Sequence, residues 1–379
     1  MKQKIKNIVA FFKTHKVKIL WGLFFLSIAV LLFLFIRNFS CLSVYFAQHH
    51  PYGELFRVFL AVVAGIGAIF IVYFTAKRVK VMEEQTKKTA EQIQIMYKGN
   101  VDTRFNNAVG HLGNEKSSVI LGGIHALHEI AVENENYRKI VHNLFCSYIR
   151  ENSAKLYEEI DFEKTPDQCP VIIQTLIDYL FKPYNGKDSV YKNYPSDLSH
   201  STLKNCNFIG VTLNECYFTD ATLTKCVFIK VTLDGCRFIG ATLTKCRFYD
   251  AILTECYFDD DATLLTECEF GCVLTKCEFS CATLTKCVFI GNSSVKTTLT
   301  ECWFFNATLT ECEFSSVLLT NCWFNTAILT KCEFNEVILT ECGFISKEPD
   351  IDMGYAKLFD CNFENIELID TELPPNETS

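Results

Sequence analysis

The chain has 379 residues, of which 49% are apolar and 13% aromatic, a composition that excludes wholesale disorder. Only 17 Gly and 8 Pro exclude a collagen-like protein or a flexible linker. The net charge of −8 is uneven, since residues 1–200 carry 24 bases and 18 acids (+6) and residues 201–379 carry 12 bases and 26 acids (−14), so no direct nucleic-acid binding is expected.

Two uncharged runs, 19–36 and 58–74, predict a transmembrane hairpin over residues 19–75. At about 1.5 Å per residue, each run is long enough to cross a bilayer core as a helix. Six lysines precede the first run within residues 1–18, three bases follow the second at 77–80, and the loop between the runs has no Lys or Arg. This bias predicts a basic cytoplasmic N-terminus and a chain held in the inner (cytoplasmic) membrane with both termini in the cytoplasm. A cleaved signal peptide is the alternative for the first run.

Residues 76–99 predict an amphipathic linker helix that continues out of the membrane. Its seven-residue spacings could form a short coiled coil and make the chain a homo-oligomer, although two threonines weaken the seam. An ordinary surface helix is the alternative. The residues in these spacings are Val79, Thr86, Ile93, Met82, Thr89 and Met96.

Residues 100–185 predict an α-helical module. Apolar residues share one helix face around Ile124 and Leu127, and a later apolar helix follows Pro170, a residue favoured at helix starts. Helices of about 15 residues with short connections predict a small HEAT-like bundle.

A cluster of potential metal ligands lies within this module. His125 and His128 are one helical turn apart, and His142 and Cys146 follow downstream. A metal site is conceivable. A partly exposed His on the flank of an apolar face is ordinary, however, so neither a metal nor another cofactor is expected, and no catalytic residue is assigned.

The strongest signal is a five-residue period over residues 198–373, followed by a short tail, 374–379. Every fifth residue is Leu or Phe in alternation, and a small residue stands two positions before each, as in ATLTK CVFIK VTLDG CRFIG from Ala221. Such a period fits a chain that turns a corner every five residues and closes a square coil in about 20, with coils stacked about 4.8 Å apart. The 32 large centres at four per coil predict about eight coils. The predicted core includes Leu223, Phe228, Leu233, Phe238, Leu243 and Phe248, with Cys226, Cys236 and Cys246 as inward small residues.

These repeats resemble the pentapeptide-repeat family, whose fold is a right-handed quadrilateral β-helix. The stretch that contains Arg104-Phe105, Leu121-Gly122-Gly123-Ile124 and Tyr148-Ile149-Arg150-Glu151 looks like the helical module found before the repeats in many bacterial membrane-anchored members of that family. This chain departs from the family in its Cys–Phe and Leu–Thr bias, where Ala–Asp/Asn–Leu is commoner. The sequence therefore predicts two transmembrane α-helices, a small HEAT-like α-helical module and about eight coils of repeats, which the resemblance identifies as a right-handed quadrilateral β-helix.

Fifteen of the 20 cysteines stand two residues before a Phe. At these positions Cys is expected to act as a small apolar residue. Columns of thiols could in principle bind a soft metal or form disulfides. Stacked side chains point in parallel rather than at each other, and the cytoplasm is reducing, so an inert structural role is expected.

Three breaks interrupt the period and are the candidate interaction loops, because loops that leave a regular scaffold often carry function. They cover residues 259–262, 290–296 and 345–355, and a bulged loop at the second break would keep the columns in register. The acidic first loop could also bind a cation, and a plain solvated loop is the alternative at each. Their candidate residues are Asp259, Asp260, Asp261, Asn292, Ser293, Ser294, Asp350 and Asp352.

The repeat supplies no general base, nucleophile or phosphate-binding loop. The sequence therefore predicts a non-enzymatic, membrane-anchored scaffold that presents its repeat surface to an unknown cytoplasmic protein. One alternative is an effector of a bacterial stress or antiphage defence system that perturbs the lipid bilayer. Another is a DNA-mimic regulator of a type II topoisomerase, since some soluble pentapeptide-repeat proteins imitate DNA; the −14 balance is compatible with it, whereas the membrane tether and interspersed lysines argue against it.

Overall fold

The structure, a computed structural model, describes residue 30 and residues 50–158, 168–183, 186–291, 296–344 and 355–377. The chain divides into two compact units, Met1–Tyr97 and Lys98–Ser379. Apart from Val30, the first predicted membrane run lies outside the described residues, and so do Asn292, Ser293, Ser294, Asp350 and Asp352 of the candidate loops.

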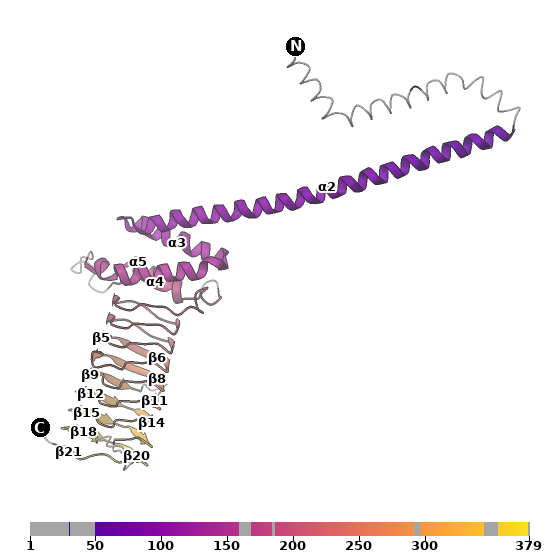
Figure 1. Cartoon of the computed structure of the whole chain (residues 1–379). Helices are drawn as coiled ribbons and strands as arrows, with labels where there is room; N and C mark the ends of the chain where they lie inside the picture. The colour runs from indigo at the N-terminus through magenta and orange to yellow at the C-terminus, as the bar shows by residue number, and fades with distance from the viewer. Residues whose placement is uncertain are drawn as a thin grey trace. The chain divides into compact units, whose positions relative to one another are not determined.

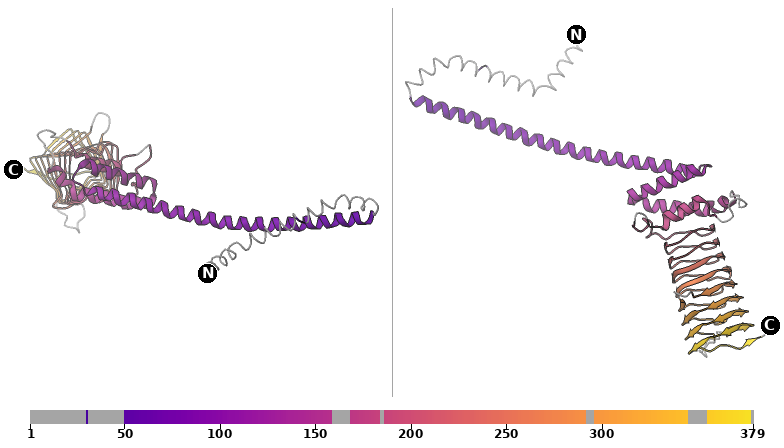
Figure 2. Two further views of the ribbon diagram at one scale, coloured as in Figure 1. Left: turned by 90° about the horizontal axis from the view of Figure 1, so that it is seen from above. Right: turned by 180° about the vertical axis from the view of Figure 1, so that it is seen from behind.

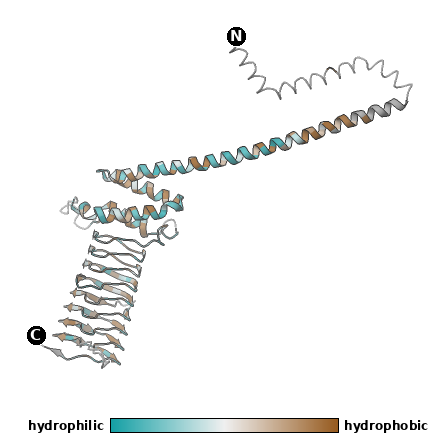
Figure 3. Cartoon of the chain, in the orientation of Figure 1, coloured by the Kyte–Doolittle hydropathy of each residue, from teal (hydrophilic) through white to brown (hydrophobic). Residues whose placement is uncertain are grey.

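One helix, α2 (His50–Leu112), contains the second predicted membrane run and the predicted linker helix (Figure 1). Among the described residues, Ala61–Leu112 is the one helical stretch long and apolar enough to cross a membrane, with a mean hydropathy of 1.7 in its most apolar window. Figure 3 shows its apolar part giving way to a mixed surface toward the helical module. The helix continues through Gly99, because one glycine costs a long helix only about 1 kcal/mol.

Three further helices form the helical module with the end of α2. They are α3 (Ser117–Glu133), α4 (Glu135–Glu158) and α5 (Val171–Phe181). Their apolar faces meet around Ile124, Phe145 and Leu176, which are fully buried. A Cβ on Gly123 would lie 2.8 Å from the Ala108 carbonyl oxygen, so this glycine lets α3 approach α2 closely.

The repeats form a parallel β-solenoid with four sides, which we name after their buried residues in chain order: first Leu, first Phe, second Leu and second Phe side. Figure 2 shows the stacked coils from behind and from above. The first Leu side consists of β1 (Thr202–Lys204), β3 (Thr222–Thr224), β5 (Thr242–Thr244), β7 (Leu264–Thr266), β9 (Thr283–Thr285), β12 (Thr308–Thr310), β15 (Ile328–Thr330), β18 (Lys357–Phe359) and β21 (Asn376–Glu377). The second Leu side holds β2 (Thr212–Asn214), β4 (Thr232–Asp234), β11 (Thr297–Thr300), β14 (Val317–Thr320), β17 (Ile338–Thr340) and β20 (Glu367–Ile369).

The two Phe sides have fewer regular strands. The first Phe side holds β10 (Val288–Ile290), β13 (Glu313–Ser315), β16 (Glu333–Asn335) and β19 (Asn362–Glu364). Two longer strands, β6 (Arg247–Thr254) and β8 (Glu269–Thr275), pass from the first Phe side to the second Leu side. The second Phe side is held by single parallel bridges, from Asp197↔Tyr217 to Gly343↔Glu372.

The pairing register confirms two Leu columns and two Phe columns along the interior. On the first Leu side, eight leucines mark eight coils: Leu203, Leu223, Leu243, Leu265, Leu284, Leu309, Leu329 and Leu358. Within each Phe column successive rings are stacked with centroids 4.6–5.0 Å apart and nearly parallel planes. The interior is therefore one apolar stack, continuous with the core of the helical module.

The breaks in the period leave this register intact. Across the acidic first break Leu243 pairs with Leu265, and across the second Leu274 pairs with Leu299, as a bulged loop predicts. Leu329 pairs with Leu358 across the third break. The buried columns therefore remain continuous across all three breaks.

The corners of the coils force non-glycine residues into left-handed backbone conformations. The residue two positions after a buried centre has a positive φ, as at Lys225 (52°), Lys245 (55°) and Glu255 (51°). Each such residue costs roughly 1–2 kcal/mol, which packing of the neighbouring centres must offset. Because these side chains lie outside the core, the corners tolerate charge.

The helical module covers the open edge of the first coil. Gln174 of α5 donates from Nε2 to the Asn207 carbonyl oxygen and accepts the Asn207 N–H at Oε1, both at 2.9 Å. The Tyr157 hydroxyl of α4 donates to the Lys204 carbonyl oxygen and accepts the Lys204 N–H, both at 2.7 Å. Helical side chains thus satisfy backbone groups that an open sheet edge would leave unpaired.

Candidate interaction surfaces and the junction pocket

The first Leu side is a surface of threonines and paired charges. Thr224 and Thr244 stand outward beside the buried leucines, half-buried by their neighbours. At the next corner, Lys245 pairs with Glu267 (3.2 Å) and Lys286 pairs with the carboxylate one coil below it, Glu311 (3.5 Å). Exposed pairs of this kind contribute only about 0–1 kcal/mol each. This side has the character of a solvated face.

The second Phe side carries an outward row of aromatic residues, which we call the aromatic ladder: Tyr217, Tyr257, Trp303 and Trp323. Parallel bridges align them in one column with Arg237 and Glu278. The Arg237 guanidinium lies over the Tyr217 ring, 5.3 Å from its centroid. Trp323 is 39% exposed.

Gly343 makes room for the last ring of the ladder. A Cβ there would lie 2.3 Å from Cε3 of Trp323, so the indole lies directly against the glycine of the next coil. Residue 343 stands in the ladder's own column, where a side chain would displace the ring. Trp323 is therefore held in place by the backbone beneath it.

Carboxylates border the aromatic ladder where the first break leaves the coil. One carboxylate oxygen of Asp259 is buried and has no hydrogen-bond donor among the described residues. Burial, followed by the charge of Asp259, raises the pKa of Glu278 in the next coil. The surface around Tyr257 thus combines aromatic rings with desolvated negative charge.

The acidic first loop is a compact corner. Asp260 has a φ of 140°, and its side-chain Oδ1 accepts the Ala262 N–H at 3.0 Å. The fully buried Thr263 closes the corner, since its hydroxyl accepts the Gly240 N–H at 2.7 Å. Asp261 lies near Cys281, whose pKa is raised by burial and then by that carboxylate. Within the described part of the chain no three potential metal ligands lie together, here or elsewhere.

The predicted core residues all lie inside the solenoid. Leu223, Phe228, Leu233, Phe238, Leu243, Phe248, Cys226, Cys236 and Cys246 are fully buried. The thiols do more than fill space, because each donates to a leucine carbonyl in the preceding coil: Cys226 to Leu203 at 3.3 Å and Cys246 to Leu223 at 3.5 Å. Alanine could not make this contact, and the five-residue period alone gave no indication of it.

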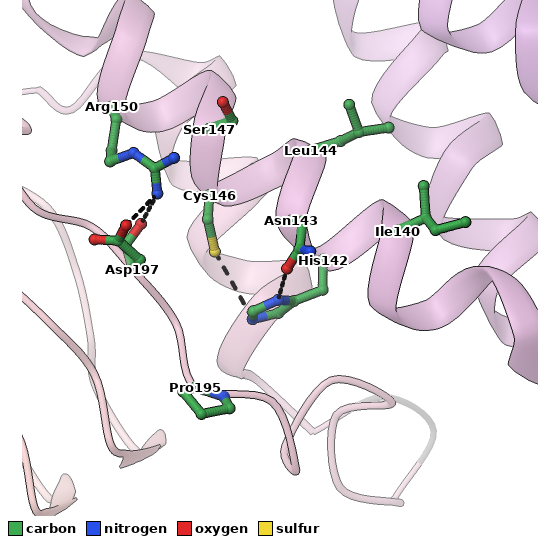
Figure 4. A pocket seen from close by; sticks show the side chains of 9 residues that line it. All are labelled: Ile140, His142, Asn143, Leu144, Cys146, Ser147, Arg150, Pro195 and Asp197. Carbon is green, nitrogen blue, oxygen red and sulfur yellow. Dashed lines mark hydrogen bonds and ion pairs between the residues drawn. The ribbon is translucent and has the colours of Figure 1, made fainter.

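A pocket of about 520 Å³ lies where the helical module meets the solenoid (Figure 4). It is lined by Ile140, His142, Asn143, Leu144, Cys146, Ser147, Arg150, Pro195 and Asp197. Arg150 donates to the Asp197 carboxylate and carbonyl oxygens at 2.8 Å. His142 Nε2 lies 2.9 Å from Ser196 Oγ and 3.7 Å from Cys146 Sγ.

This Cys–His pair is not an activated nucleophile. Burial raises the pKa of Cys146 to about 12 and lowers the pKa of His142, so a thiolate–imidazolium pair is disfavoured at neutral pH. The Ser196 and Asp197 contacts instead fix α4 to the segment that enters the first coil. The pocket is a structural joint.

The histidines of the module pack against aromatic residues. His125 Nδ1 lies 2.7 Å from the Tyr179 hydroxyl, and the His128 ring is stacked on Tyr179 with centroids 4.0 Å apart. Burial, followed by the charge of His125, lowers the pKa of His128 to about 4. The downstream pair, His142 and Cys146, belongs to the junction pocket, so the structure separates the two halves of the conceivable metal cluster.

Comparisons with known proteins concern the repeats. A family model described as pentapeptide repeats (8 copies) matches residues 196–228 and 223–260. Searching the curated proteins finds no match.

Two of the similar solved structures, HetL and Rfr23, are described as pentapeptide-repeat proteins. HetL of the cyanobacterium Nostoc sp. strain PCC 7120, involved in heterocyst differentiation regulation, is 15% identical, with 46% of this chain and 82% of HetL covered and a TM-score of 0.25. A trypsin-treated variant of QnrB1, a plasmid-mediated fluoroquinolone resistance protein, is 16% identical (45% and 78% covered, TM-score 0.19). Rfr23 of the cyanobacterium Cyanothece 51142 is 14% identical (45% and 88% covered, TM-score 0.13). With TM-scores this low, none of these likenesses bears on what this chain does.

Proposed function

We propose that this chain, a pentapeptide-repeat protein with a parallel β-helix-like solenoid, is a non-enzymatic scaffold anchored in the inner membrane and binding a cytoplasmic protein. The observation that carries the proposal is the aromatic ladder with its bordering carboxylates. Tyr and Trp are enriched where proteins bind each other, since they bury a large area at little entropic cost. The ladder is set on stacked coils that pre-organise its rings.

The partner's chemistry follows from the charge beside the ladder. Asp259 and Glu278 border Tyr257, and burial already raises the pKa of Glu278. A lysine or arginine side chain would be attracted by these carboxylates and could also lie over the exposed Trp323 ring, as Arg237 does over Tyr217. We therefore propose a partner segment that presents basic residues among apolar ones.

The membrane anchor rests on α2 and on the sequence bias around it. No residue of its apolar stretch is buried within the described structure, which in water would be costly and in a bilayer is favourable. The bases at 77–80 and in residues 1–18 favour a cytoplasmic location for the solenoid. Alkaline carbonate washing of membranes tests this: the full chain should stay in the pellet, and a chain lacking residues 1–75 should not.

The partner is tested by affinity capture of the full chain from its host in mild detergent, with mass spectrometry. Trp303→Ala with Trp323→Ala should remove the partner, and Asp259→Asn with Glu278→Gln should weaken its binding and flatten its salt dependence.

The matched control changes threonines on the neighbouring first Leu side, Thr308→Ala with Thr310→Ala, and should leave the partner bound. Circular dichroism verifies folding of each variant. A partner retained by the double tryptophan variant would overturn the assignment of the ladder.

A further inference from the structure

The part of α2 beyond the predicted membrane run has an apolar face that no described residue of its own compact unit covers. In a heptad frame, Val79, Thr86 and Ile93 occupy position a, and Met82, Thr89 and Met96 occupy position d. The four large apolar residues among them are 49–73% exposed. Every charged side chain between residues 77 and 98 falls at another position of the heptad. We call the a and d positions from Gly65 to Met96 the seam.

The two threonines do not spoil the seam. Thr86 donates its hydroxyl to the Met82 carbonyl oxygen at 2.8 Å, and Thr89 donates to the Gln85 carbonyl oxygen at 2.9 Å. With their hydroxyls satisfied inside the helix, they can offer methyl groups to a neighbour. Thr86 and Thr89 are therefore compatible with a coiled-coil interface at these positions.

The same heptad frame continues into the predicted membrane run, where the seam consists of small residues. Counting back by heptads places Val72 and Gly65 at position a and Thr75 and Ala68 at position d. A Cβ on Gly65 would meet nothing within 4 Å, so no contact in the described structure accounts for this glycine. Large apolar residues drive helix association in water, whereas small ones permit close contact in lipid. The seam changes from one type to the other where the helix is expected to leave the bilayer.

We propose that two copies of this chain associate through the seam as a parallel, two-stranded coiled coil. β-Branched residues occupy position a at Val79, Thr86 and Ile93, and unbranched Met occupies two of the three d positions beside them, a pattern close to that of parallel dimers. In a parallel pair, Arg78 at position g of one chain faces Glu83 at position e of the other, so the charges agree with this orientation. The strict seven-residue repeat implies a left-handed supercoil.

The parallel orientation also agrees with the proposed membrane anchor, because two copies inserted in one membrane would run in the same direction. The part of the seam outside the predicted membrane run does not depend on that anchor. Pairing presents two solenoids at once, which raises the avidity for a partner that has two binding sites. Detergent solution separates the two proposals, since the dimer needs neither the membrane nor the partner.

Two isoleucines on the same helix provide a matched test of the seam. Ile93 lies on the seam and is 59% exposed, whereas Ile95 lies at position c and is 72% exposed. Light scattering of the full chain in mild detergent should give a polypeptide mass twice the 43.3 kDa of one chain. Ile93→Lys should reduce it to that of one chain, and Ile95→Lys should leave it unchanged. A monomeric wild-type chain, a larger assembly, or equal effects of the two variants would overturn the proposal.

Cysteine cross-linking tests the orientation independently. Met82→Cys at position d should form a disulfide-linked dimer on mild oxidation with copper phenanthroline, since equal d positions meet only in a parallel pair in register. Glu84→Cys, two residues away at position f, is the control, and the wild-type chain gives the background of its own cysteines. Cross-linking at residue 84 but not at residue 82 would overturn the parallel arrangement.

Discussion

The phenylalanine stacks predict how the stability of the solenoid depends on position. Phe238 is fully buried, and its ring is stacked between Phe218 (4.9 Å) and Phe258 (4.6 Å). Phe238→Ala should cost about 3–5 kcal/mol through lost burial and a cavity. Two stacked contacts, at about 0.5–1.5 kcal/mol each, place the loss near the upper end of that range.

A ring at the end of the same kind of column provides the comparison. Phe363 in the last coil is partly exposed and is stacked on Phe334 alone, at 4.9 Å. Phe363→Ala should therefore cost only about 1–2 kcal/mol. Urea unfolding of the full chain in detergent, followed by tryptophan fluorescence, measures both, with the outward Thr244→Ala as a control near zero. If Phe238→Ala costs no more than Phe363→Ala, the stacked core does not carry the stability.

Three further predictions concern the helical module and its joint with the solenoid. Gln174→Ala should destabilise the first coil by about 1–3 kcal/mol, because it leaves both backbone groups of Asn207 unsatisfied, and amide hydrogen exchange there should quicken. The Cys169 and Cys206 sulfurs lie 3.0 Å apart, so diamide oxidation should join these two before any pair within the solenoid, as peptide mapping would reveal. The pKa of His128 is about 4 when folded against 6.5 in an unfolded chain, so the unfolded state binds more protons between these values. Its contribution, about 3 kcal/mol, is present above pH 6.5 and lost as the pH falls toward 4; His128→Gln should flatten thermal stability over this range.

The five-residue period was sufficient to predict the interior of the solenoid. Leu and Phe alternate strictly, so with four sides to a coil each residue type must fall on two opposite sides. The pairing of Leu274 with Leu299 shows that this holds even across a break. Because burial at a fixed spacing depends only on nearby residues in the sequence, the interior could be predicted without knowledge of long-range contacts.

The capping of the first coil could not be read in the same way. Gln174 and Tyr157 lie 33 and 47 residues from the backbone groups they satisfy. Each is an ordinary polar residue on an amphipathic helix, and only the docking of α4 and α5 onto the sheet edge gives them that role. The sequence also did not indicate where the linker helix ends. It was predicted to end at residue 99, but no proline follows Gly99 in the next turns, and the helix continues to Leu112.

The aromatic ladder lies between these two cases. Each of its members stands directly before a Phe of the second Phe side, and the pairing register across the insertions is needed to align them in one column. Tyr217 and Tyr257 are two coils apart, and Trp303 and Trp323 are adjacent. Counting residues in blocks of 20 would have misplaced the tryptophans, because the first two breaks intervene. The aromatic residue types were visible in the sequence, whereas the pairing register that aligns them was not.

The pairing register also shows which side of the solenoid each of the three breaks follows. The first and third breaks follow Phe258 and Phe344, which belong to the second Phe side, whereas the second break follows Phe289 of the first Phe side. Two of the three insertions therefore interrupt the chain between the second Phe side of one coil and the first Leu side of the next. Insertions at a corner cost little while the buried columns continue unbroken, so stability alone does not favour this corner over the other three. The first of these insertions lies beside Tyr257 and the carboxylates of Asp259 and Glu278, and this supports the proposal that a partner binds the second Phe side.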